Sequence, residues 1–350
     1  MFRSRFRISD VRMSERARLR REANIANAAE DGCLPADDYD EELLEAMSAA
    51  AVSISGWERG GDMPIIAWDS TFERYMRSRQ VALQRIVDSG FSWFPWDIIP
   101  ALPSNFRRGN QFAFSQQSVP SCAGFAAAFA KHASTLTDIA LGQPMLYNPY
   151  NPLVTWVISK GGSMRGGQSI AAIGAAVNRH GNFPIEVAGD NVTRQPDTRT
   201  HANVALNYQS GLCWMPTDNL VDRVFEAAKA GFGIFLGNTI KVGGSSTDRN
   251  GVRVATLSGS WNHATSINSW VTVGGEEYVY WLNSHGRRYT AADILGSPAD
   301  GAWMTKAIAS RFLSTAGRYG RLGVVLSESI PVVYDSFEPI VKAVNSGLTR

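Results

Sequence analysis

The residue with the clearest potential for chemistry in this 350-residue chain is Cys122, in the stretch QQSVPSCAGFAAAFA. A loop is followed here by a predicted helix, with Ser121 at the N-cap and apolar residues at helical spacing as far as Ala140. A thiol in the first helical turn meets free backbone N–H groups and the positive end of the helix dipole, which predicts a lowered pKa and a reactive thiolate. Cysteine is also common as a core residue among Ala and Phe, so the chemical interpretation depends on partners elsewhere in the chain.

Two downstream stretches supply such partners. WNHATSINSW contains His263, far along the chain from Cys122, and the next stretch, GGEEYVYWLNSHG, contains Asn283. A thiol nucleophile, an imidazole base and an amide that orients the imidazole are the parts of a cysteine-type acyl-transfer site. They predict a thiolate–imidazolium pair of Cys122 and His263, with Asn283 holding the imidazole ring.

In this order and spacing the chain resembles the papain family (C1 type) of cysteine peptidases, over roughly residues 102 to 330. Gln116 stands six residues before Cys122, as the oxyanion-hole glutamine of that family does. The resemblance therefore implies that Gln116 and the backbone N–H of Cys122 bind the oxyanion. Asn262-His263-Ala264 is similar to the family's histidine strand, Asn283-Ser284 opens its asparagine motif, and LPSNFRRG is similar to the start of its mature domain.

Other positions match the family only in part. Met164-Arg165-Gly166-Gly167 falls where the family has Cys-x-Gly-Gly, which implies that Gly166 and Gly167 border the bound substrate backbone. Ala123 replaces the tryptophan that follows the nucleophile, and Val119 and Met164 replace a disulfide pair. His285 replaces the tryptophan of Asn-Ser-Trp-Gly, which assigns it to the substrate cleft. Beside the Asn283–His263 bond, a second imidazole would disfavour the charged form of His263.

The predicted fold class is α+β, with a papain-like arrangement of a helical lobe, a β-barrel-like lobe and a cleft between them. The periodicity predicts helices first and strands later. The helices are expected from Cys122 to about Gly142 and over 153–160, 169–180 and 220–230, and the strands over 233–240, 252–258, 263–273 and 276–284. The domain boundary is placed near Ala101, which gives an N-terminal extension (1–101) and a peptidase-like domain (102–350).

The N-terminal extension alternates in charge. Residues 1–22 contain eight arginines, and residues 30–45 contain eight acidic residues and no base. Helices are expected over 41–51 and 70–88, and the segment FSWFPWDIIPALP, rich in aromatic residues and proline, is expected to cross an apolar surface as an extended strap. The extension is interpreted either as a divergent pro-segment or as an anchoring arm.

The composition indicates where the protein is located and whether it binds a membrane, a metal or a cofactor. Three cysteines cannot form a disulfide framework, the N-terminus lacks an apolar signal region, and no run of 18 apolar residues occurs. We therefore expect a cytoplasmic or virion location, no signal peptide and no membrane association. His132, His180 and His201 lack partners at ligand spacing, so we expect no metal site, and no cofactor is indicated.

Three functions remain open at this point. The first is a cysteine endopeptidase that acts on a peptide or protein through an acyl-enzyme. The second is a structural or interaction component of a larger assembly, such as a phage virion, with protein partners bound through the N-terminal arm and a papain-like domain that is active or inactive. The basic arm also suits nucleic acid, although no recognisable nucleic-acid motif follows it. The third is a deamidase or amide transferase on the same fold.

Overall fold

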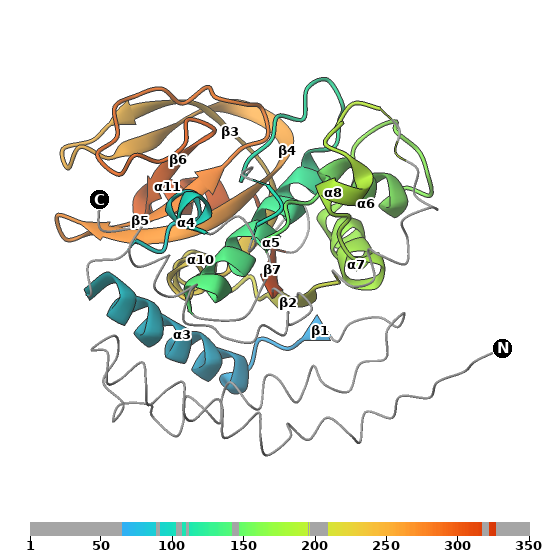
Figure 1. Cartoon of the computed structure of the whole chain (residues 1–350). Helices are drawn as coiled ribbons and strands as arrows, with labels where there is room; N and C mark the ends of the chain where they lie inside the picture. The colour runs from blue at the N-terminus through green and yellow to red at the C-terminus, as the bar shows by residue number, and fades with distance from the viewer. Residues whose placement is uncertain are drawn as a thin grey trace, which may run out of the picture.

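The computed structural model describes residues 65–88, 92–102, 107–109, 112–141, 147–194, 196, 209–316 and 322–326. Within these residues the chain forms one seven-stranded sheet with helices packed against it, so the predicted α+β class is confirmed (Figure 1). The charged blocks of the N-terminal extension, the helix expected over 41–51 and the C-terminal tail lie outside the described residues.

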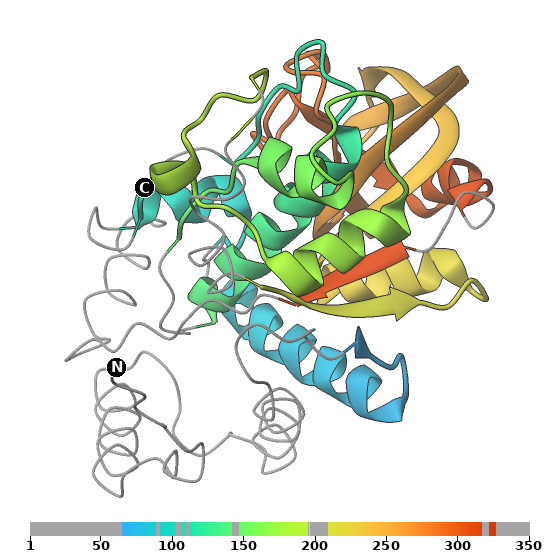
Figure 2. The ribbon, with the colours of Figure 1, turned by 90° about the vertical axis from the view of Figure 1, so that its right-hand side faces the viewer.

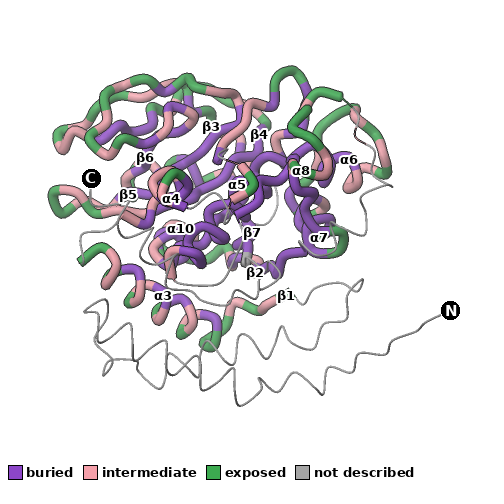
Figure 3. The backbone as a smooth tube through the Cα atoms, viewed as in Figure 1, coloured by how far each residue is buried: buried purple, intermediate pink, exposed green. Residues whose placement is uncertain are grey.

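Helix α5 (Cys122–Ala140) runs through the centre of the molecule. All its residues from Ala123 to Ile139 are buried (Figure 3), the polar ones in its second half included, so the helix lies in the core on every side. Strands β3 and β4 contact it on one side, and α6 (Pro152–Ser159) and α7 (Ile170–His180) contact it on the other. Gly124 permits the close contact with α6, because a Cβ atom there would lie 2.4 Å from the carbonyl oxygen of Pro152. This helix therefore joins the helical half to the strand half.

The sheet has the strand order β1-β2-β7-β3-β4-β5-β6. Its neighbouring strands pair antiparallel except for β1 with β2, and one additional parallel pair, Val254 with Trp303, links β4 to β6. The strands are β1 (Ile65–Ile66), β2 (Gly211–Met215), β3 (Gly233–Thr247), β4 (Arg253–Val273), β5 (Glu276–Leu282), β6 (Gly301–Thr305) and β7 (Leu322–Leu326). Among the described residues, the end strands β1 and β6 do not pair with each other, so the sheet does not close and a β-barrel-like lobe is not confirmed.

Strand β4 corrects one detail of the prediction, because two separate strands were expected over 252–258 and 263–273. The structure has a single 21-residue strand, and its pairing with β3 contains three register shifts between Asn238 and Gly244. Such irregularities let a long strand bend without breaking. His263 therefore lies within a continuous strand, opposite Asn238, and not at the start of a new one.

Two helices before Leu102 also contact the core. Helix α3 (Ser70–Asp88) begins and ends where predicted and contributes Phe72 and Met76 to one hydrophobic cluster. Helix α4 (Pro95–Ala101) contributes Ile98 and Ile99 to another. The expected extended strap is therefore wrong over these seven residues, because Pro95 at the first helical position and the apolar surface beneath favour a short helix.

The remaining helices complete the outer layer (Figure 2). They are α8 (Ile185–Ala188), α10 (Leu220–Lys229) and α11 (Lys306–Leu313). Among the described residues, none of the helices is both long and apolar enough to cross a lipid bilayer.

Candidate active site

The centre of the site is a hydrogen bond between His263 and Asn283. His263 belongs to β4 and Asn283 follows the last residue of β5, and the antiparallel pairing of these strands brings the two side chains together. His263 Nε2 lies 2.7 Å from Asn283 Oδ1, and both residues are buried. Asn283 Nδ2 donates to the hydroxyl of Tyr289 at 2.9 Å, which turns Oδ1 toward the imidazole. His263 Nε2 therefore carries the proton of this bond, and Nδ1 is left as the basic nitrogen.

Cys122 reaches the same cleft from the helical half. It is the first residue of α5 and is half-buried. The cleft has a volume of about 460 Å³ and is lined by Gln116, Pro120, Cys122, Gly167, Trp261, Asn262, His263 and His285. The predicted nucleophile and base, which lie far apart in the sequence, thus face one cavity between the two halves.

The ionisation of this pair differs from the prediction. Burial raises the pKa of the Cys122 thiol, and the backbone groups of Ala264, Ala123 and Cys122 itself oppose that rise only in part. Burial also lowers the pKa of His263 to about 4, with a further contribution from the positive charge of His285 and an opposing one from Asn283. The prediction of a lowered thiol pKa is therefore wrong, because burial of Cys122 outweighs the favourable groups at the helix start. At neutral pH the resting pair is a thiol and a neutral imidazole.

His285 lies directly against the base. Its ring is stacked on that of His263, with a centroid separation of 4.2 Å and an interplanar angle of 25°. Trp261 also contacts the His263 ring, at 4.5 Å. These flat rings help to bury the imidazole, and the cationic form of His285 disfavours a positive charge on His263 in the way the sequence suggested.

Gln116 lies beside the cleft and is buried. Its backbone N–H donates to the carbonyl of Ser284 at 2.8 Å, and its side-chain Oε1 accepts a bond from the Ser284 hydroxyl. Its Nε2 donates one proton to the carbonyl of Val119 at 3.0 Å. A primary amide has two N–H protons, so this bond leaves the second one available, and Gln116 is among the residues that line the cleft. The loop before α5 is thereby tied to the segment that contains Asn283.

The two predicted substrate-binding glycines lie differently. Gly167 lines the cleft, whereas Gly166 is not among the lining residues. The amine of Lys160 donates to both carbonyls, at 3.1 Å for Gly166 and 2.9 Å for Gly167, and holds this loop in place. Gly166 has a φ of +69°, a conformation that L side chains rarely adopt, which accounts for glycine at this position. Contact of either glycine with a substrate stays a prediction.

Two residues that complete the site were not predicted from the sequence. Trp261 precedes His263 by two residues, and side chains at that spacing share one face of a strand, so the strand period contained a signal for it. Its indole N–H donates to Asn238 on β3 at 3.2 Å. Tyr289, six residues beyond Asn283 in a loop, carried no periodic signal.

Among the described residues, no group of three or more His, Cys, Asp or Glu side chains could hold a metal ion.

Comparison with known proteins gives matches at the level of structure alone. No family model and no curated protein matches the sequence. One similar structure, from a study of antibody cross-reactivity between the mite allergens Blo t 1 and Der p 1, has 14% identity and a TM-score of 0.38. That match covers 61% of this chain and 66% of the other, just under two thirds of its length. Procathepsin L 3 from the larval midgut of Tenebrio molitor has 10% identity and a TM-score of 0.42, with 82% and 99% of the chains covered. Both are papain-like cysteine peptidases. Because the identities and TM-scores are low, a proposal about the function of this chain has to rest on the geometry of the site.

Proposed function

We propose that this protein is a papain-like cysteine peptidase that cleaves peptide bonds through an acyl-enzyme. The observation that carries the proposal is the 2.7 Å bond between His263 and Asn283 in a cleft that Cys122 enters from the opposite half. Because this bond occupies Nε2, Nδ1 of His263 is the nitrogen available to exchange a proton with the Cys122 thiol.

The chemistry then follows in two stages. The Cys122 sulfur attacks the scissile carbonyl while its proton passes to His263 Nδ1, and the oxyanion accepts bonds from Gln116 Nε2 and the backbone N–H of Cys122. The imidazolium gives that proton to the leaving amine, and the C–N bond breaks to form a thioester. Water then attacks the thioester, with His263 taking its proton and returning it to the departing thiol. In this sequence the imidazolium forms only transiently, in keeping with the low pKa of His263.

The test combines thiol labelling with cleavage of a peptide mixture. A thiol-reactive epoxide should modify Cys122 quickly, because His263 can take the thiol proton as the sulfur reacts. It should leave Cys213 untouched, because Cys213 is fully buried and burial raises its pKa to about 12. Cys33, outside the described residues, is also expected to react slowly. Peptide products found by mass spectrometry should disappear in Cys122→Ala, and His263→Ala should slow both labelling and cleavage. Release of ammonia from glutamine side chains without backbone cleavage would favour the deamidase, and equal labelling of all three cysteines would contradict activation of Cys122 by His263.

A further inference from the structure

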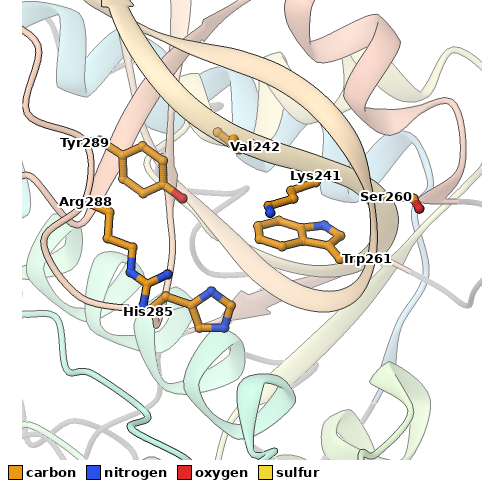
Figure 4. A pocket seen from close by; sticks show the side chains of 8 residues that line it. Lys241, Val242, Ser260, Trp261, His285, Arg288 and Tyr289 are labelled. Atoms are coloured by element: carbon orange, nitrogen blue, oxygen red, sulfur yellow. The ribbon is translucent and has the colours of Figure 1, made fainter.

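A second pocket adjoins the cleft at the His285 and Trp261 rings (Figure 4). Its volume is about 280 Å³, and both rings line this pocket and the cleft. The other residues that line it come from β3, from β4 and from the loop after β5, namely Lys241, Val242, Gly243, Ser260, Arg288 and Tyr289.

The charged residues that line this pocket are all basic. None of its lining residues is acidic, and two of them, Lys241 and Arg288, are cations on exposed side chains. Within the described part of the chain, neither cation has an ion pair. Burial lowers the pKa of His285, and the charges of Arg288 and Lys241 lower it further, which places both cations within electrostatic reach of that ring.

The neighbouring Arg287 has a different environment. Burial raises the pKa of the Asp300 carboxyl, and the positive charge of Arg287 opposes that rise. Arg287 is exposed and does not line the pocket. Arg287 is thus within electrostatic reach of an acid of the protein itself, whereas Lys241 and Arg288 line an open pocket.

The reaction geometry relates this pocket to one side of the substrate. His263 must protonate the leaving amine, so the leaving part of the substrate has to run past the His263 ring. His285 and Trp261 contact that ring at 4.2 Å and 4.5 Å and also line the second pocket. The residues that follow the scissile bond would therefore extend into it.

We propose that this pocket binds a carboxylate of the substrate on the leaving-group side, either an Asp or Glu side chain or the C-terminal carboxylate of a short peptide. The inference rests on the proposed function for the direction of the substrate. Arg288 can present a planar fork to a carboxylate, and Lys241 supplies a second charge from the neighbouring strand. The Tyr289 hydroxyl accepts a bond from Asn283 and so keeps its own proton to donate. Val242 and Trp261 provide an apolar wall for the carbon atoms of the ligand.

The experiment uses the full-length protein and acetylated peptides whose acyl-side residues are randomised. One pair, amidated at the C-terminus, carries Glu or the isosteric Gln at the first two positions after the scissile bond. A third peptide has neutral side chains and a free C-terminal carboxylate at the second of these positions. Removing a cation, in Lys241→Gln or Arg288→Gln, should lower kcat/KM for the carboxylate peptides by about 5-fold each, which is the effect of losing an exposed ion pair. The value of kcat/KM for the Gln peptide should stay the same. The preference should also weaken with salt, and Arg287→Gln is the matched control.

A binding measurement separates this inference from the proposed function. The same peptides are titrated calorimetrically into Cys122→Ala protein, and again after Lys241→Gln and Arg288→Gln are added to that background. Charge-dependent binding without any cleavage in the native protein would support the pocket and contradict the peptidase. Cleavage or binding that is equal for Glu, Gln and free-carboxylate peptides would overturn the inference while leaving the peptidase standing. The two carboxylate peptides also show which source of the carboxylate is preferred.

Discussion

At the scale of single residues, burial determines the protonation states of the candidate nucleophile and base. The sequence places a thiol at a helix start and an imidazole downstream, a combination that is typical of an ion pair. In the structure Cys122 is half-buried and His263 is buried, and both neutral forms are favoured as a result. In the proposed reaction the proton therefore moves during the attack and not before it, and the pH dependence of that reaction should reflect the neutral imidazole.

The first prediction concerns the acid side of the pH–rate profile. Since His263 must be neutral to accept the thiol proton, kcat/KM should be constant above about pH 5 and fall as the pH drops through about 4. His285→Phe keeps a flat ring against His263 and removes the like charge that lowers its pKa. The pKa of His263 should then rise, and the acid limb should move to higher pH. An unmoved limb in this variant would show that His285 does not act on His263 through its charge.

The second prediction tests Tyr289 as a positioning residue. Tyr289→Phe removes the acceptor of Asn283 Nδ2 and frees the amide to rotate away from His263. A net hydrogen bond of about 1 kcal/mol corresponds to a decrease in kcat of about 5-fold. The KM for an uncharged peptide should change little. Asn283→Ala should cost more, about 100-fold, because it removes the orienting group itself. A rise in KM with kcat unchanged would mean that Tyr289 contacts substrate and does not position Asn283.

At the scale of elements, α5 is a buried helix fixed by polar side chains at defined points. His132 accepts a bond from the backbone N–H of Tyr150 at Nε2, at 3.0 Å, and its Nδ1 therefore donates to the carbonyl of Phe112 at 3.2 Å. Arg79 of α3 forms a buried ion pair with Asp138 near the other end of α5. These contacts orient a helix whose apolar surface alone would not define its rotation about its axis.

The third prediction follows from the buried neutral His132. Burial lowers its pKa from 6.5 to about 4, so the unfolded chain binds a proton in this pH range that the folded chain does not. The contribution of His132 to the free energy of unfolding should therefore be fully present above pH 6.5. As the pH drops to about 4, this residue should lower the free energy of unfolding by about 3 kcal/mol. Urea unfolding of His132→Gln across that range should show a pH slope smaller by one proton. An unchanged slope would contradict a neutral His132 in the folded protein.

The fourth prediction compares a buried ion pair with an exposed one. Removing one partner of a buried pair leaves an uncompensated charge, so Arg79→Met or Asp138→Leu should lower the free energy of unfolding by about 3–5 kcal/mol. The double variant should recover part of this loss, since no buried charge remains. The matched control is the exposed pair of Arg249 and Glu276, 4.0 Å apart, for which Arg249→Met should cost under about 1 kcal/mol. Equal, additive losses at the buried pair would show that the two side chains are not coupled.

At the scale of the whole molecule, the segment before Leu102 contributes to two hydrophobic clusters that also contain residues of the sheet and of α5. Phe72 of α3 stacks on Phe232 at 5.7 Å, and Trp96 of α4 contacts Phe94 at 4.9 Å and Tyr280 at 4.7 Å. None of the residues that line the cleft comes from the described residues 65–101. The boundary near Ala101 and the choice between a pro-segment and an arm stay predictions that deletion can test.

The fifth prediction is the outcome of that deletion. A chain that begins at residue 102 would expose the apolar surface that α3 and α4 cover, so we expect it to lose cooperative thermal unfolding. Phe72→Ala alone should cost about 3–5 kcal/mol. A chain that lacks only residues 1–45 keeps every core residue named here and serves as the control. If the extension is a pro-segment, the full-length chain should cleave itself between about Gly90 and Asn105 and gain activity. A stable, active product that begins in this range would contradict the expected loss of cooperative unfolding.

Several features of this protein were determined by the sequence alone, because they depend on local periodicity or on order along the chain. The bounds of α3, the start of α5, and the bounds of α7 and α10 to within one residue follow from apolar residues at helical spacing between local breaks. The order of Cys122, His263 and Asn283 along the chain predicts the chemistry that we propose, although several helices and strands separate the first from the last.

Only the tertiary structure decided the properties that depend on what surrounds a residue. The neutral state of Cys122 and His263 arises from burial by segments far apart in the sequence, and the helix start by itself predicts the opposite sign for the thiol. The same holds for Tyr289, which no local pattern connects to Asn283, and for Lys241 and Arg288, which come to one pocket from a strand and a distant loop. Burial and electrostatic proximity are set by the whole fold, and local sequence patterns do not contain them.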